Sequence, residues 1–359
     1  MQAIPVFRKT MIVVMLVALF FAAHPTLAGA KGGDQARSPK LFSTEATLAL
    51  TLTAPWKEFA RNKNAKTNYP ATLEYVDEAG AKHSLSLTVT TRGHNRLKVC
   101  KFPPIKLIFE KEAVKETPFH GNKSLKLVTR CDSDERSEQY VVKEILAYRI
   151  YNLVTERSFK ARPLAITYVD RADHSSDGPH FAFLLEDDSD VAKRNDLGKL
   201  DVTTLDLAQL EPLEASRMSL FEYLIGNTDF AVLTGSPGKP CCHNAVLLGE
   251  NKPSKVFAAP YDFDSSGLVD TNYSTPSPVL KIRSNRDRVF RGFCAKNETL
   301  AAARREFLRL EPQILGLART ESHLTTASRE AVNDYLSKGF EVLRDDGKFA
   351  RDVTEKCRK

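Results

Sequence analysis

The chain has 359 residues, of which 42% are hydrophobic and 27% are charged, and its formal net charge at pH 7 is +7. This is the composition of a globular protein long enough to bury a substantial core, and it excludes collagen-like and largely disordered classes. The 52 basic residues are interspersed with 45 acidic ones rather than clustered, which argues against a dedicated nucleic-acid binder.

The first 30 residues have the layout of a cleavable secretory signal. Arg8 and Lys9 precede an apolar run at 11–23, and small residues at 28–30 allow cleavage before Lys31. The apolar run is shorter than the roughly 17–25 residues of a membrane-spanning helix. An uncleaved anchor is the alternative. We therefore expect an exported protein, periplasmic or secreted, that does not span the membrane after cleavage.

All six cysteines follow the expected cleavage site, and an oxidising compartment would allow them to pair. We expect Cys100 to pair with Cys131, because both lie near strand ends, and Cys242 to pair with Cys294. The connectivity stays open on sequence alone. A zinc site at 241–243 is the alternative, disfavoured because adjacent residues lack the usual two-residue spacer between zinc ligands.

The first half of the mature chain is predicted to be β-rich. After a polar, Gly-rich and flexible start at 31–45, apolar and polar residues alternate in short segments. We expect strands at 47–52, 71–77, 83–91, 105–109, 125–129, 163–169 and 180–185. From Glu138 to Val154 the apolar period changes to that of a helix of about four turns. Trp56 is expected to anchor packing rather than to form a platform for a sugar.

The second half is predicted to be mainly helical, with helices over 204–226 and 298–345. The first helix is expected to end at Gly226. Between the helices lie a Pro- and Gly-rich loop and two short apolar segments, at 227–243, 245–248 and 256–259. The order of elements therefore predicts strands first and helices second.

Acidic and amide side chains gather in three stretches of the second half, Asn227-Thr228-Asp229, His243-Asn244 and Asp262-Phe263-Asp264. Oxygen ligands of this kind suit hard cations such as Mg²⁺, usually with substrate phosphates completing the shell. Each stretch alone is more often a turn or a cap. Their order along the chain, an Asp, then an Asn, then an Asp, is that of protein-kinase-like phosphoryl-transfer sites.

Further segments extend this order: Arg92-Gly93, Pro104-Ile105-Lys106-Leu107, Lys123-Ser124-Leu125-Lys126-Leu127, Lys143-Glu144, Phe183-Leu184-Leu185-Glu186 and Pro260-Tyr261-Asp262-Phe263-Asp264. Over about residues 45–270 the chain resembles the spore-coat CotH group of atypical, secreted kinase-like proteins. The resemblance implies an α+β, two-lobed protein-kinase-like fold. Its β-rich N-terminal lobe would span 46–186 and its mainly α-helical C-terminal lobe 187–359.

The resemblance also implies a catalytic and metal-binding set. Asp229 would orient the acceptor hydroxyl, Asn244 would help to hold Mg²⁺ or Mn²⁺, and Asp262 would bridge metal and phosphate, with Asp264 as a second metal ligand. Fifteen positions separate Asp229 from Asn244, which is longer than the usual spacing. Tyr261 stands where the family usually has tryptophan.

A second implied set would bind ATP. Lys126 would neutralise the α- and β-phosphates, and Glu144 would hold this lysine by an ion pair. Glu186 would lie near the nucleotide base, between the lobes. Lys106 and Lys123 compete with Lys126 for the phosphate role, and a solvent-facing lysine is the plain alternative on an alternating strand.

These features predict an exported, metal- and ATP-dependent phosphotransferase that is monomeric. Four arginines after the metal-binding stretch, at 283, 286, 288 and 291, favour an unknown protein or an anionic envelope component as its substrate. The alternative is a catalytically inactive kinase-like scaffold of the cell envelope, because free ATP is scarce outside the cytoplasm. A metal hydrolase built on the three aspartates ranks last.

Overall fold

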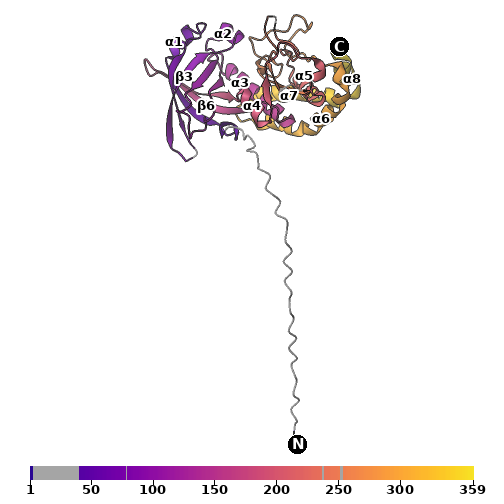
Figure 1. Ribbon diagram of the computed structural model, residues 1–359, viewed down its shortest axis with the longest axis horizontal. Coiled ribbons are helices and arrows are strands. Elements are labelled where there is room, and N and C mark those ends of the chain that lie inside the picture. The colour runs from indigo at the N-terminus through magenta and orange to yellow at the C-terminus, as the bar shows by residue number, and fades with distance from the viewer. Residues whose placement is uncertain (3–39, 78, 237, 251–253) are drawn as a thin grey trace. The chain divides into compact units, whose positions relative to one another are not determined.

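The computed structural model of the chain describes residues 1–2, 40–77, 79–236, 238–250 and 254–359 (Figure 1). Apart from Met1 and Gln2, the expected signal peptide lies outside these ranges, as does most of the expected flexible start. The end of that start forms a short 3₁₀ helix, Lys40–Phe42, which buries Leu41 and Phe42. No helix within the described ranges is both long and apolar enough to cross a membrane.

Seven strands of the first half form a closed barrel, in the order β1-β2-β3-β4-β5-β7-β6 (Figure 1). Their bounds are Leu48–Ala54 (β1), Tyr69–Val76 (β2), Lys82–Thr91 (β3), Ile105–Phe109 (β4), Ser124–Val128 (β5), Ala161–Asp170 (β6) and Ser176–Leu185 (β7). Neighbouring strands are antiparallel except β1 and β6, which are parallel. Alternate residues are buried along β2, as expected where inward side chains fill a barrel.

The closed barrel corrects the expected two-lobed protein-kinase-like fold, because such a barrel is not a typical kinase-like lobe. Its closure comes from β1 and β6, which pair in register from Leu48 and Leu164 to Ala54 and Asp170. Alternation in the sequence predicts strands but does not say which strands pair, and these two lie far apart in the chain. The coarser expectation of mixed strands and helices agrees with the structure.

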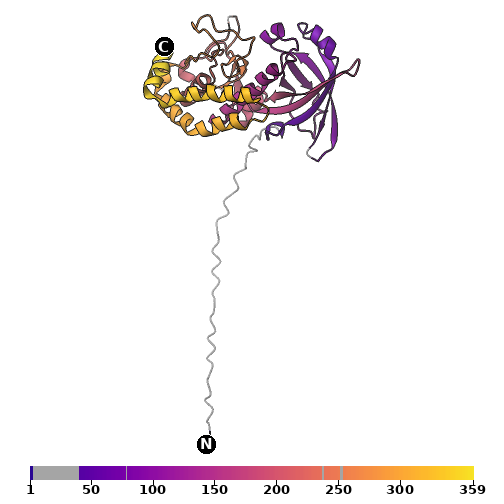
Figure 2. The ribbon, with the colours of Figure 1, turned by 180° about the vertical axis from the view of Figure 1, so that it is seen from behind.

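Eight α-helices are present in the described ranges, besides short 3₁₀ helices. They are Trp56–Arg61 (α1), Asn95–Val99 (α2), Glu135–Val154 (α3), Asp188–Arg194 (α4), Pro212–Ile225 (α5), Asn297–Thr320 (α6), Thr326–Arg344 (α7) and Asp346–Asp352 (α8). Asp134 caps α3 by accepting the Ser137 N–H, and Gly226 ends α5 with a positive φ of 65°. The region expected to be mostly helical at 298–345 consists of α6 and α7, which lie side by side in both views (Figures 1 and 2).

A three-stranded sheet, in the order β10-β9-β8, accompanies the helices. Its strands are Gly198–Leu200 (β8), Ala245–Gly249 (β9) and Val256–Pro260 (β10). Strand β7 connects the two halves of the core. Ala182 and Leu184 are buried inside the barrel, whereas Phe181 and Phe183 belong to the core formed by α3, α5, α6 and α7. The described residues from Lys40 onward belong to one compact unit.

Three disulfides are present, and one of the two predicted pairs is confirmed. Cys100 is bonded to Cys131, but Cys242 is bonded to Cys241, and Cys294 is bonded to Cys357. The segment before α6 pairs with the C-terminal tail through backbone hydrogen bonds, and this contact brings Cys294 to Cys357. No local sequence pattern announces such a long-range pairing, so the predicted Cys242–Cys294 pair was wrong.

Candidate active site

Asp229 lies in a loop that begins where α5 ends. After Gly226 the chain turns back, and the Asn227 N–H donates to the carbonyl of Glu222 over 2.8 Å. The Asn227 side-chain oxygen then accepts the Asp229 N–H over 3.0 Å. About half of the Asp229 side chain is exposed. The loop therefore holds the backbone of Asp229 in place while its carboxylate stays accessible.

His243 and Asn244 reach Asp229 despite the long intervening loop. Ala231 and His243 exchange two backbone hydrogen bonds of 2.9 and 3.0 Å, which bring the ends of the loop together. Asn244 Nδ2 donates to the backbone carbonyl and to Oδ2 of Asp229, over 2.8 and 3.1 Å. His243 Nε2 lies 2.7 Å from Asp229 Oδ1, and this hydrogen bond raises the pKa of His243. Asp229, His243 and Asn244 form one hydrogen-bonded group.

Asp262 joins this group through the ends of β9 and β10. The Tyr261 N–H donates to the carbonyl of Asn244 over 3.0 Å, and the Asp262 N–H donates to Tyr148 Oη over 2.9 Å. Asn244 and Asp262 both have left-handed backbone conformations, with φ of 51° and 65°. Such conformations are uncommon for residues other than glycine and gather at functional sites. The three acidic and amide stretches of the sequence thus meet in space.

Glu144 and Asp264 complete a cluster of carboxylates with Asp262. Burial, followed by the nearby charge of Asp262, raises the pKa of Asp264 to about 6, and Tyr273 Oη donates to Asp264 Oδ2 over 3.1 Å. Burial, followed by Asp264 and Asp262, raises the pKa of Glu144 well above its ordinary value. These mutual effects on the pKa values place the three carboxyl groups near one another.

Arg92 and Arg96 supply positive charge beside this cluster. Both lower the pKa of Glu144, so both lie close to it. Arg92 Nε donates to the carbonyl of Ile105 over 3.2 Å, and an Arg96 guanidinium N–H donates to the carbonyl of Thr129. The resemblance to the CotH group gave Arg92 no role, and Arg96 was not predicted. The available signal was two arginines spaced around a glycine at the end of a predicted strand.

Lys126 lies beside the site but does not make the implied ion pair with Glu144. Its Nζ lies 3.2 Å from Asp188 Oδ1 and 4.5 Å from the centre of the Tyr261 ring, the residue before Asp262. Lys106 is its partner in the register of β4 and β5. About a third of the Lys126 side chain is exposed. Asp188, at the start of α4, was not predicted as its partner.

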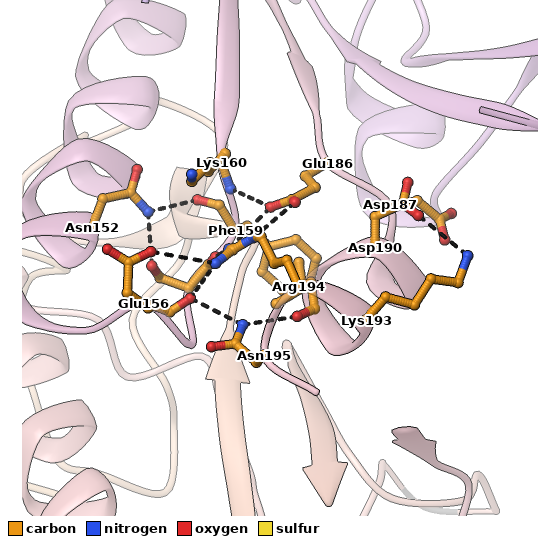
Figure 3. A network of polar contacts seen from close by, with 12 residues as sticks. Asn152, Glu156, Phe159, Lys160, Glu186, Asp187, Asp190, Lys193, Arg194 and Asn195 are labelled. Atoms are coloured by element: carbon orange, nitrogen blue, oxygen red, sulfur yellow. Dashed lines mark hydrogen bonds and ion pairs between the residues drawn. The ribbon is translucent and has the colours of Figure 1, made fainter. Parts of the chain in front are cut away.

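Glu186 is occupied by a different network (Figure 3). Its two carboxylate oxygens accept from Arg194 Nε and Nη2 over 2.9 and 3.1 Å, and one also accepts the Lys160 N–H over 2.9 Å. Arg194 donates further to the carbonyls of Glu156 and Ser158. Glu186 is fully buried, and these contacts link the end of β7 to the segment after α3. The arrangement indicates a structural role rather than contact with a nucleotide base.

The side chains around Asp262 include oxygen ligands of the kind that hard divalent cations prefer. Asn244, Asp262 and Asp264 offer amide and carboxylate oxygens, which Mg²⁺ and Mn²⁺ prefer. In the part of the chain that the structure describes, no group of three or more His, Cys, Asp or Glu side chains is arranged to hold a metal ion. A divalent ion here would therefore complete its shell with water or substrate phosphate, as Mg²⁺ usually does.

Glu222, directly behind the Asp229 loop, gives a prediction for stability. It is almost fully buried, and burial raises its pKa to about 8 against the opposing effects of Asn227 and Arg291. The folded state therefore holds the proton more tightly than the unfolded state, so stability falls as pH rises from about 4.5 to about 8. Between these pH values the Glu222 carboxyl is expected to lower the free energy of unfolding by up to about 4 kcal/mol, and Glu222→Gln should remove this loss. Urea unfolding at pH 5 and pH 8 measures it, and an unchanged decline would contradict the prediction.

Comparison with protein families and curated proteins assigns no family to the chain. No protein-family model matches the chain, and no curated protein matches it. The resemblance to the CotH group stays a prediction from short motifs, and function is inferred from the residues of the site.

Proposed function

We propose that the protein is a metal- and ATP-dependent phosphotransferase. One observation carries the proposal: Asn244 Nδ2 donates two hydrogen bonds to Asp229, and the Asn244 carbonyl accepts the N–H of Tyr261, the residue before Asp262, so three separate stretches meet at the ends of β9 and β10. Phosphoryl transfer needs positioning and charge neutralisation more than covalent chemistry by the protein. A hydrogen-bonded acidic group beside fixed cations supports that reaction.

Asp229 is the residue proposed to orient the acceptor. Its Oδ1 lies against His243 and its Oδ2 accepts from Asn244, so the carboxylate is held in one orientation. Half exposed, it remains within reach of a substrate hydroxyl and accepts the proton of that hydroxyl as transfer proceeds.

The phosphates would lie between two sets of charges. Lys126, Arg92 and Arg96 neutralise phosphate oxygens directly. Asn244, Asp262 and Asp264 would hold Mg²⁺ or Mn²⁺, which supplies further neutralisation when bound. The hydrogen bonds from Asn244 Nδ2 to Asp229 hold the Asn244 side chain in place before substrate arrives.

An extracytoplasmic location is part of the proposal. Three disulfides join all six cysteines, which supports an oxidising compartment. The acceptor is proposed to be a protein or an anionic envelope component, because the arginine-rich segment after Asp264 gives that region a positive charge.

Thermal unfolding tests the proposal. Mg²⁺ or Mn²⁺ with ATP is expected to raise the melting temperature of the wild type by several degrees, because a ligand that binds only the folded state stabilises it. Asp262→Asn should abolish the rise, whereas Asp334→Asn, an exposed position on α7, should leave it intact. No rise with any nucleotide and either metal would contradict the proposal.

A catalytically inactive nucleotide-binding protein is the second candidate. The observation in its favour is that Lys126 pairs with Asp188 and not with Glu144. A rise in melting temperature with ATP and metal, without transfer of labelled phosphate to any acceptor or to the chain itself, would favour this second function over the first.

A further inference from the structure

Arg291 contacts the backbone of the loop that carries Asp229. Its Nη1 donates to the carbonyls of Thr228 and Phe230, the latter over 2.7 Å. These carbonyls belong to the residues directly before and directly after Asp229. The guanidinium also lies 4.9 Å from the centre of the Phe230 ring. Arg291 therefore holds the backbone on both sides of the residue that is proposed to orient the acceptor.

The remaining backbone groups of Asp229 are bonded to other side chains. Asn244 Nδ2 donates to the Asp229 carbonyl over 2.8 Å, and the Asp229 N–H donates to Asn227 Oδ1 over 3.0 Å. This N–H belongs to the same planar peptide group as the Thr228 carbonyl, so Asn227 and Arg291 hold the two polar ends of one rigid unit. These bonds fix the direction in which the Asp229 side chain leaves the backbone.

The segment that carries Arg291 is itself anchored at two places. Before it, Arg288 donates through Nε and Nη2 to the carbonyl of Leu224 near the end of α5, over 3.3 and 3.2 Å. After it, Cys294 is bonded to Cys357 of the C-terminal tail. Arg291 therefore reaches the Asp229 loop from a backbone that is held on both sides.

The Arg291 guanidinium is not engaged in a salt bridge within the described ranges. Burial lowers the pKa of Arg291, and the nearby charges of Glu222 and then Asp229 oppose this effect. Burial raises the pKa of Glu222 to about 8, so this neighbour is mostly uncharged at pH 7. The loop carbonyls are therefore the hydrogen-bond acceptors of Arg291, whereas the sequence predicted only that it adds positive charge.

We propose that Arg291 is a positioning residue, which holds Asp229 in the orientation that accepts the proton of the acceptor hydroxyl. The inference rests on the proposed phosphotransferase function, because it assigns a support to that site. Arg291 acts through the carbonyls of Thr228 and Phe230 and not by contact with ATP or metal. Both hydrogen bonds come from the single atom Nη1, so a lysine ammonium can replace them in part.

Arg291→Met tests the inference, because methionine keeps an apolar stem beside Phe230 but has no donor. Transfer of labelled phosphate from ATP and Mn²⁺ to the chain itself should become about 10- to 100-fold slower at saturating ATP, the cost of misplacing a reacting group by about 1 Å. The KM for ATP and the rise in melting temperature with ATP and Mn²⁺ should not change, whereas general damage to the fold would alter both. Arg291→Lys should recover much of the rate, and Arg351→Met, which removes an exposed arginine of α8, should transfer like the wild type.

Amide hydrogen exchange measured by NMR gives a second readout that needs no phosphate transfer. The Asp229 N–H should exchange at least about tenfold faster in Arg291→Met, because its peptide group loses the hydrogen bond at the Thr228 carbonyl. The Tyr261 N–H, which donates to the Asn244 carbonyl, is the internal control and should exchange as in the wild type.

The two readouts separate failure of this inference from failure of the proposed function. If the wild type transfers no phosphate, the phosphotransferase proposal is contradicted, and exchange of the Asp229 N–H alone decides whether Arg291 holds this residue. Unchanged exchange at Asp229 in Arg291→Met, or transfer at the wild-type rate, overturns the inference. If Arg291→Met does not fold, the shorter and uncharged Arg291→Gln decides by the same two measurements.

Discussion

Asp229→Asn is expected to lower the rate of phosphate transfer by about 10²- to 10⁴-fold, the usual contribution of a general base. Asparagine keeps the shape of the side chain and can still bond to His243, but it cannot accept the proton of the acceptor hydroxyl. The nucleotide- and metal-dependent rise in melting temperature should stay close to that of the wild type, because Asp229 is not a proposed metal ligand. Single-turnover transfer of labelled phosphate and thermal unfolding measure the two effects.

The control for this experiment is Asp201→Asn, an exposed position on the segment after β8. It should transfer phosphate at the wild-type rate. Transfer that survives in Asp229→Asn would remove this residue from the catalytic role. Loss of the thermal response, as in Asp262→Asn, would instead mean that Asp229 binds the metal.

Arg194→Ala is expected to lower the free energy of unfolding by about 3–5 kcal/mol. Glu186 is fully buried, and Arg194 supplies two of the hydrogen bonds to its carboxylate (Figure 3). Removing the guanidinium leaves a buried carboxyl with the Lys160 N–H and without its paired charge. It also removes one donor to the carbonyl of Glu156, which keeps Asn195 Nδ2, and the donor to the carbonyl of Ser158. Urea unfolding at pH 7 measures the loss.

Two further variants separate the ion pair from its surroundings. Lys193→Ala removes a neighbouring, exposed lysine of α4 and should cost less than about 1 kcal/mol. Replacing the whole pair, with Glu186→Leu and Arg194→Met together, should recover much of the stability, because no buried charge remains unpaired. Equal losses in Arg194→Ala and Lys193→Ala would show that the pair contributes little.

Local patterns in the sequence predicted most individual elements. The strands expected at 83–91 and 105–109 are β3 and β4, and the helix expected from Glu138 is α3, which begins three residues earlier at Glu135. Gly226 ends α5 in the left-handed conformation that favours glycine. These features depend on residues close together in the sequence. The spacing of apolar residues, or one glycine at a helix end, is therefore sufficient to predict them.

Features that depend on distant contacts could not be predicted in the same way. The parallel pairing of β1 with β6 closes the barrel and rules out the expected kinase-like fold. The bond between Cys294 and Cys357 likewise needs the tail to reach the segment before α6. The period of apolar residues in a segment does not show which other strand pairs with it, and cysteine positions do not show which cysteines are bonded to each other.

The candidate site shows the same division. The sequence order suggested that Asp229, Asn244 and Asp262 belong together. In the structure Asn244 is hydrogen-bonded to Asp229 and to Tyr261, the residue before Asp262. Partners were harder to predict, because a buried lysine or carboxylate looks like an exposed one in a sequence. For this reason the pairing of Lys126 with Asp188 was not predicted. The position of Arg96 beside the carboxylates was not predicted either.

The location of the metal tests the proposed chemistry most directly. Crystals grown with Mn²⁺ and a non-hydrolysable ATP analogue can be examined by anomalous scattering at the manganese edge. We expect a manganese peak within roughly 2.0–2.6 Å of oxygens of Asp262 and Asn244, with the phosphates facing Lys126. A nucleotide bound elsewhere, or manganese that does not contact Asp262, would contradict the proposed phosphotransferase site.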